Sequence, residues 1–142
     1  MPTVEVSFTP LPAHVRTARL VATAVARRSG VDESLLDEVR LAVGEACSRA
    51  VEAHRQYCPT EPIRVALTDD GERFEVVVTD SAPADVPIAP EIGGGPLVVD
   101  GVVQQLPAGV GLAVIAGLAD DVRILPVSDG TSVAMSWKRR SL

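Results

Sequence analysis

Pairs of short alternating segments joined by tight turns restrict the fold more than any other feature of this sequence. Apolar and polar residues that alternate around a glycine-containing turn are typical of a β-hairpin. The first pair is residues 63–68 and 74–79, around DDGE; the second is 122–126 and 131–137, around Ser128-Asp129-Gly130; another alternating segment is residues 3–8. Strands joined in this way predict a mainly antiparallel sheet.

Two segments carry apolar residues at helical spacing instead. The first, residues 13–29, begins after Pro12 and stops at Gly30. The second is longer: Asp32 can cap its start, and it runs to about His54. Its predicted buried stripe consists of Leu35, Leu36, Val39, Val43, Ala46, Cys47 and Ala50.

Residues 109–120 (GVGLAVIAGLAD) predict a third, short helix that opens on Gly109-x-Gly111. Before it, residues 81–108 contain five prolines and the run Gly93-Gly94-Gly95, so we expect a long loop. A functional lid and an insertion without a role both remain open for this loop. Three helices can cover one face of the sheet. We therefore expect an α+β fold, a two-layer α/β sandwich, as a single domain over residues 1–142.

Composition limits the function classes. Hydrophobic residues make up 46% of the 142 residues and aromatic residues 3%, so the core must be aliphatic. The net charge of -6 argues against direct nucleic-acid binding and is compatible with a basic protein partner. With no spanning apolar run and no signal peptide, we expect no membrane association and a cytoplasmic location. Cys47 and Cys58 are expected to be free thiols.

Four short motifs occur in a particular order: Glu45–Ala50 (EACSRA), Asp80–Ala84 (DSAPA), Gly109–Leu112 (GVGL) and Asp129–Thr131 (DGT). In these contexts they resemble the motifs of the GHKL ATPase superfamily. Within it, the chain is most similar to the anti-sigma-factor serine kinases of the RsbW and SpoIIAB type. The resemblance extends over nearly the whole chain and implies a Bergerat-type ATP-binding fold.

The resemblance assigns roles to the long helix. Glu45 matches the family's general base. Arg49 stands where the family has an asparagine whose oxygen helps to ligate Mg²⁺. A guanidinium has five donors and no acceptor, so it cannot ligate a cation.

The same resemblance assigns further nucleotide-binding positions. Asp80 matches the aspartate that receives the adenine amino group, but Ala82 and Ala84 replace the two glycines that follow it. Glycine permits positive φ and close approach to a ligand, which alanine makes harder. The remaining matches are Gly109, Gly111 and Leu112 of the second glycine box, whose helix start offers N–H groups to phosphates, and Thr131 near the adenine.

For function, the resemblance implies partner switching. A homodimer would sequester an alternative sigma factor, and a STAS-domain anti-sigma-factor antagonist would compete for an overlapping surface; Arg16 and Arg19 of the first helix would contribute to partner binding. Active relatives phosphorylate the antagonist on serine. Because Arg49 replaces the metal ligand, we expect weak or lost ATP binding, no Mg²⁺ site, and little or no kinase activity. Two alternatives stay open: an active serine kinase in which Arg49 contacts phosphate, and a regulator whose pocket senses another ligand.

The residues also allow simpler interpretations. Glu45 and Arg49, four apart on one helix, could form a surface ion pair. Asp80 could be an ordinary turn former and Gly130 an ordinary hairpin residue. His14 and His54, both near helix ends, are interpreted as surface residues.

Overall fold

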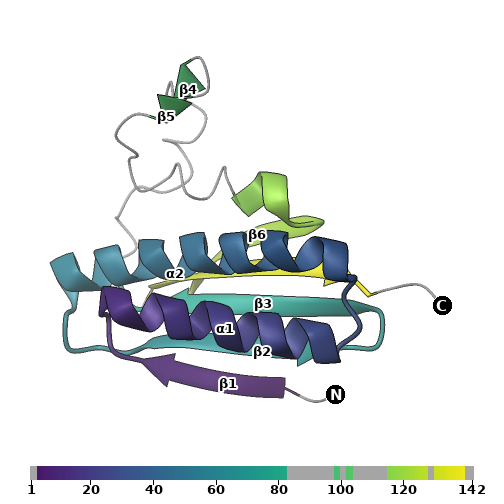
Figure 1. Cartoon of the computed structure of the whole chain (residues 1–142). Helices are drawn as coiled ribbons and strands as arrows, with labels where there is room; N and C mark the ends of the chain where they lie inside the picture. The colour runs from purple at the N-terminus through teal and green to yellow at the C-terminus, as the bar shows by residue number, and fades with distance from the viewer. Residues whose placement is uncertain (1–2, 83–97, 100–101, 104–114, 128–129, 140–142) are drawn as a thin grey trace.

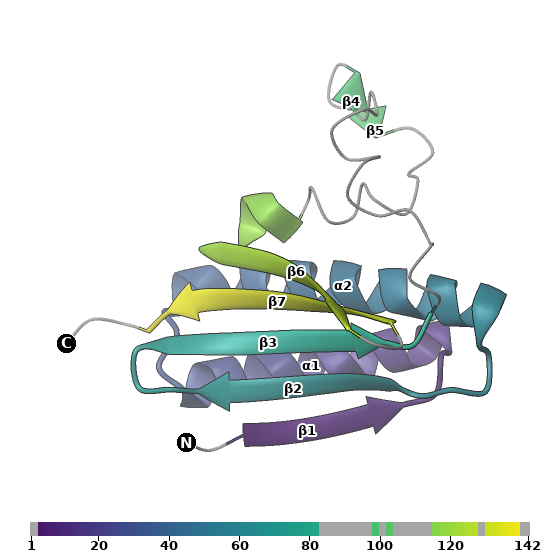
Figure 2. The ribbon, with the colours of Figure 1, turned by 180° about the vertical axis from the view of Figure 1, so that it is seen from behind.

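The computed structural model describes residues 3–82, 98–99, 102–103, 115–127 and 130–139. Within these residues the chain forms a five-stranded antiparallel sheet whose one face is covered by helices (Figures 1 and 2). The strands are β1 (Thr3–Phe8), β2 (Ile63–Asp69), β3 (Arg73–Asp80), β6 (Asp121–Val127) and β7 (Gly130–Lys138). Their order is β1-β2-β3-β7-β6, so β3 and β7 join the two predicted hairpins side by side. The α+β fold predicted from the sequence is confirmed.

Two long helices form the second layer. α1 (Pro12–Arg28) begins with proline in its first turn, and α2 (Leu36–Tyr57) follows a 3-10 turn, η1 (Glu33–Leu35). The side chain of Asp32 accepts the N–H of Ser34, so this residue caps η1 rather than α2 itself. α2 extends one turn beyond the predicted end at His54. Figure 2 shows both helices behind the sheet and the opposite sheet face without a helix over it.

The core lies between the helices and the sheet. The inward residues of each central strand alternate, as the period of a strand requires: Ile63, Val65 and Leu67 on β2, Phe74, Val76 and Val78 on β3, and Val133, Met135 and Trp137 on β7. From α2, the predicted stripe is buried except for Leu35, which is half-buried. The inward alternation of β3 continues one step beyond the apolar residues and places Asp80 on the core face.

The segment between β3 and β6 differs in part from its prediction. Val98–Val99 and Val102–Val103 pair as two short antiparallel strands, β4 and β5, where the sequence predicted only loop. Residues 115–118 are helical, which agrees with the end of the predicted third helix. The expected lid glycines 93–95 and the start of that helix at Gly109 lie outside the described residues.

Candidate functional site at the end of strand β3

A buried ion pair connects the middle of α2 to the end of β3. Arg49 Nη2 donates to Asp80 Oδ2, across 31 positions of sequence. The side chain of Arg49 is 5% exposed and that of Asp80 is 2% exposed. The predicted alternative, a surface pair between Arg49 and Glu45, is therefore wrong: the guanidinium is long enough to reach the sheet, where a carboxylate without other charge partners attracts it.

The backbone around Asp80 is tightly enclosed. Asp80 Oδ1 accepts the N–H of Ala82 at 3.0 Å, and Thr131, also buried, is the cross-strand neighbour of Asp80 on β7. A Cβ added to Gly130 would lie 1.9 Å from the Asp80 carbonyl oxygen. Gly130 is thus more than a hairpin residue, because only glycine lets β7 approach Asp80 so closely.

His54 holds the residue next to Asp80, and the interpretation of His54 as a surface residue is wrong. Its side chain is fully buried, and its Nε2 accepts the N–H of Ser81 at 2.8 Å. Nδ1 lies 2.9 Å from the Glu61 carbonyl oxygen, to which it must donate. This pair of bonds requires the neutral imidazole with its proton on Nδ1. A histidine at the predicted helix end gave no sequence signal of this role. His14, by contrast, is half-buried beside Thr9.

Glu45 lies apart from this cluster. It lines a groove of about 310 Å³ between α1 and α2, together with Arg19, Leu41 and Ser48. Gly44 forms part of the floor: a Cβ there would lie 2.7 Å from Cδ of Arg19, so the arginine stem crosses α2 at this glycine. The groove contains neither Arg49 nor Asp80; Asp80 borders a different cavity, which does not include Glu45.

The groove carries charges of both signs. Arg19 and Arg55 alternate with Glu45 and Glu52 along its walls. In the part of the chain that the structure describes, no ion pair joins these four side chains to one another or to any other group. Their charges are therefore available to a binding partner. Arg16 is exposed one turn before Arg19 on α1.

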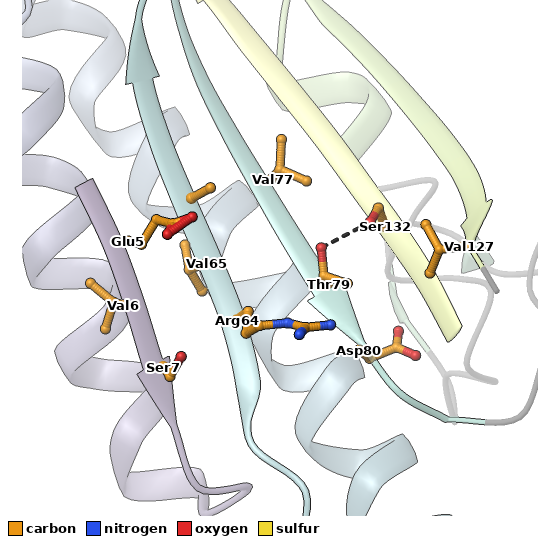
Figure 3. Close-up of a pocket in the computed structure, with 11 residues that line it drawn as sticks. Glu5, Val6, Ser7, Arg64, Val65, Val77, Thr79, Asp80, Val127 and Ser132 are labelled. Atoms are coloured by element: carbon orange, nitrogen blue, oxygen red, sulfur yellow. Dashed lines mark hydrogen bonds between the residues drawn. The ribbon is translucent and has the colours of Figure 1, made fainter. Parts of the chain in front are cut away.

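A second cavity, of about 390 Å³, lies mainly over the uncovered face of the sheet (Figure 3). Arg64 reaches from β2 toward Thr79 on β3, and Thr79 Oγ1 lies 2.8 Å from Ser132 Oγ on β7. Asp80 borders this cavity, but its carboxylate is engaged by Arg49 and Ala82. Glu5 and Arg64 supply one charge of each sign.

The electrostatic surroundings of Asp80 extend to the end of α2. Burial raises the pKa of the Cys58 thiol, and the carboxylates of Asp80 and Glu61 add to the increase. The predicted free state of both cysteines is confirmed, with Cys47 in the core. For Cys47, burial raises the pKa to about 12 despite the nearby Arg19. Neither environment favours the reactive thiolate at neutral pH.

The described residues do not fit a magnesium-nucleotide site. Arg49 offers donors where a metal requires lone pairs, and Asp80, the carboxylate expected to receive adenine, is buried against that same arginine. Among the described residues no group of three or more His, Cys, Asp or Glu side chains could hold a metal. The structure thus brings together Arg49, Asp80, Ala82 and Thr131, and it separates Glu45 from them. Ala84, Gly109, Gly111 and Leu112 lie outside the described residues.

Comparison with known proteins agrees with this fold. Residues 8–137 match the histidine kinase-like ATPase domain family, to which the chain therefore belongs. Within that family it groups with the RsbW serine-protein kinases. It is 32% identical over 136 residues to serine-protein kinase RsbW of Bacillus subtilis (strain 168), covering 94% of this chain and 83% of that protein. For serine-protein kinase RsbW of Bacillus licheniformis the identity is 28% over 126 residues, covering 88% and 78%.

Two solved structures share the fold. One contains the RsbU and RsbW domains of Rv1364c from Mycobacterium tuberculosis, with a TM-score of 0.66 and 20% identity; it matches 99% of this chain, which spans only 34% of that longer chain. The other is the mycobacterial sensor histidine kinase MprB, with a TM-score of 0.55 and 17% identity over 99% of this chain and 100% of the other. At these identities the likeness concerns the fold alone. No helix in the described part of this chain is long and apolar enough to cross a membrane.

Proposed function

We propose that this protein is an anti-sigma factor that acts by binding. In this proposal it works as a cytoplasmic homodimer, sequesters an alternative sigma factor, and releases it when a STAS-domain antagonist binds an overlapping surface. It transfers little or no phosphate. Membership of the RsbW group supports the partner-switching role.

The buried Arg49–Asp80 pair is the observation that favours binding over catalysis. Phosphoryl transfer depends on a positioned metal ion and on a fixed nucleotide. In this chain the residue at the metal-ligand position, Arg49, is a cation. The carboxylate at the adenine-binding position, Asp80, is its counter-ion. Both departures concern chemistry and leave the α1–α2 layer intact, so a binding function can persist without the reaction.

The α1–α2 groove supports a protein partner at that layer. Arg16 and Arg19 lie on α1, and unpaired Arg and Glu side chains line the groove together with apolar Val15 and Leu41. Leu41 is 53% exposed. Exposed apolar side chains with uncompensated charges around them are typical of interfaces that select a partner by charge. The net charge of -6 also favours a basic, DNA-binding partner such as a sigma factor.

The central experiment is capture from the source cell. The tagged full chain is used as bait and the co-purifying proteins are identified by mass spectrometry; we expect a sigma factor, a STAS-domain protein, or both. The purified sigma factor is then titrated with antagonist in the presence of the bait, and we expect release. Arg16→Glu combined with Arg19→Glu should abolish capture. Arg16→Glu alone should weaken capture, while Arg123→Glu on β6, a single charge reversal outside this surface, should not. Recovery of neither partner class contradicts the proposal.

An active kinase is the second candidate, because the relatives are named serine-protein kinases and Glu45 is retained. Incubation with radiolabelled ATP, Mg²⁺ and the captured antagonist separates the two functions. We expect little or no label on the antagonist. Rapid stoichiometric labelling would establish the kinase and remove the binding-only proposal.

A further inference from the structure

By the resemblance to the ATPase family, Arg49 stands at the position of the metal ligand and Asp80 at the position that receives the adenine amino group. We propose that Arg49 takes the place that an adenine amino group would have against the Asp80 carboxylate. In this way Arg49 makes the protein exclude adenine nucleotides. The inference rests on the proposed function for the identity of the site. It adds that Arg49 alone disables two parts of that site. Its guanidinium cannot ligate a metal, and its ion pair with Asp80 blocks the carboxylate that would bind adenine.

The contact leaves little room for a competing donor. Asp80 Oδ2 faces the Arg49 guanidinium and Oδ1 faces the Ala82 N–H. With exposed fractions of 5% and 2%, water does not weaken the attraction between the two charges. An adenine amino group is neutral, so it would have to replace a charge-assisted hydrogen bond with a weaker one. It would also have to displace a buried cation that has no other described counter-ion.

The backbone of Asp80 is held in place by its neighbours. The Asp80 carbonyl oxygen lies against Gly130, and the next residue, Ser81, is held by His54 Nε2. Ladder pairing with Thr131 fixes the strand on its other side. With the backbone held from three directions, a shift of the strand does not release the carboxylate, so a ligand reaches it only if the ion pair with Arg49 opens.

Stability alone is a poor explanation for the pair. Arg49 Nε is buried and has no hydrogen-bond partner among the described residues. A buried ion pair is often no more stabilising than well-packed apolar residues, and an unsatisfied donor lowers its value further. The arrangement is better explained as one that controls what this end of the sheet can bind.

Titration calorimetry with ADP, with and without Mg²⁺, tests the inference on the full-length protein. Arg49→Asn supplies the short amide that the resemblance expects at this position and removes the guanidinium that engages Asp80. We expect it to bind ADP at least tenfold more tightly than the wild type. Arg28→Asn is the matched control: it makes the same charge change on α1, at an exposed residue with no ion pair among the described residues. We expect it to bind ADP as the wild type does.

A gain of less than tenfold in Arg49→Asn, or an equal gain in Arg28→Asn, overturns the inference. If Arg49→Asn has no cooperative melting transition, Arg49→Gln replaces it under the same threshold, since its longer amide keeps a donor near Asp80. Partner capture is measured in parallel. Capture without an ADP gain rejects only this inference, whereas an ADP gain without any captured sigma factor or STAS protein rejects only the proposed function.

Discussion

At the residue scale, the side chain of Arg49 leaves α2 and meets Asp80 on the sheet, so two charged residues are buried in a mostly aliphatic core. Asp80 also accepts the Ala82 N–H, and Ser81 is bound by a neutral histidine. Each polar group here depends on a neighbour from another element. A substitution at one of these residues should therefore disturb the hydrogen bonds of the others.

Gly130 offers the sharpest test of that dependence. In Gly130→Ala the new methyl group would overlap the Asp80 carbonyl oxygen, at 1.9 Å, so β7 must move away from the end of β3. We expect a loss of about 2–3 kcal/mol in the free energy of unfolding, measured by urea denaturation. Gly117→Ala is the control, because nothing lies within 4 Å of its added Cβ. Equal stability of the two variants would show that the strands yield freely at this point.

Cys47 predicts how stability changes at alkaline pH. Burial raises the pKa of its thiol to about 12 in the folded protein, against an ordinary value of 9.0. Above about pH 9 the unfolded chain loses this proton while the folded chain keeps it, so alkali favours unfolding. At pH 10.5 we expect the wild type to have lost roughly 1–2 kcal/mol more, relative to pH 8, than Cys47→Ala loses.

Urea midpoints at the two pH values measure this difference. Cys58→Ala keeps the buried thiol and should retain most of the alkaline loss. If Cys47→Ala declines as steeply as the wild type does, the thiol is not responsible.

At the element scale, α1 and α2 form both a wall of the core and the candidate partner surface. Many of their buried residues are small: Ala18, Ala22 and Ala26 on α1, and Ala42, Ala46 and Ala50 on α2. Small side chains let the two helices approach closely. The same close approach lays the stem of Arg19 across Gly44 and so sets where its charge lies in the groove.

Gly44→Ala separates stability from partner binding. The added methyl group must displace the stem of the Arg19 side chain, and alanine offsets that cost because it raises helix propensity by about 1 kcal/mol. We therefore expect unchanged or slightly higher stability together with partner affinity reduced about fivefold or more. Calorimetric titration with the captured sigma factor and thermal melting measure the two effects. Unchanged affinity would exclude a role for the present Arg19 position.

At the scale of the whole molecule, the strand order places β7 between β3 and β6, and every residue of β7 from Gly130 to Trp137 is buried. Trp137 packs near Phe74 of β3 and donates its Nε1–H to the Leu118 carbonyl oxygen at 3.0 Å. One strand thus ties together the sheet, the residues before β6, and the helical layer through the common core.

Such a shared core predicts cooperative unfolding. Trp137 is the only tryptophan and lies in β7, whereas helical far-UV ellipticity comes mainly from α1 and α2. We expect urea transitions followed by tryptophan fluorescence and by ellipticity at 222 nm to coincide. A fluorescence midpoint clearly separated from the ellipticity midpoint would show that sheet and helices unfold independently.

The sequence by itself determined the elements and the family. Period-2 alternation in the hairpins and apolar stripes in the helices are local patterns, and they predicted the antiparallel sheet and the buried face of α2. The order of the motifs around Glu45 and Asp80 was enough to indicate the ATPase fold. The continued alternation of β3 also carried the signal that Asp80 points inward, although a strand-ending aspartate more often marks a turn.

Only the tertiary structure decided which of these residues meet. Arg49 was expected beside Glu45 because local spacing pairs residues four apart, yet it binds a carboxylate 31 positions away. His54 was expected at the surface and is buried by the Ser81 segment, and Gly130 was expected to serve only its own hairpin. Contacts of this kind depend on strand register and on the reach of a side chain across the core. Neither is encoded in a local pattern, because both are set when the two layers pack.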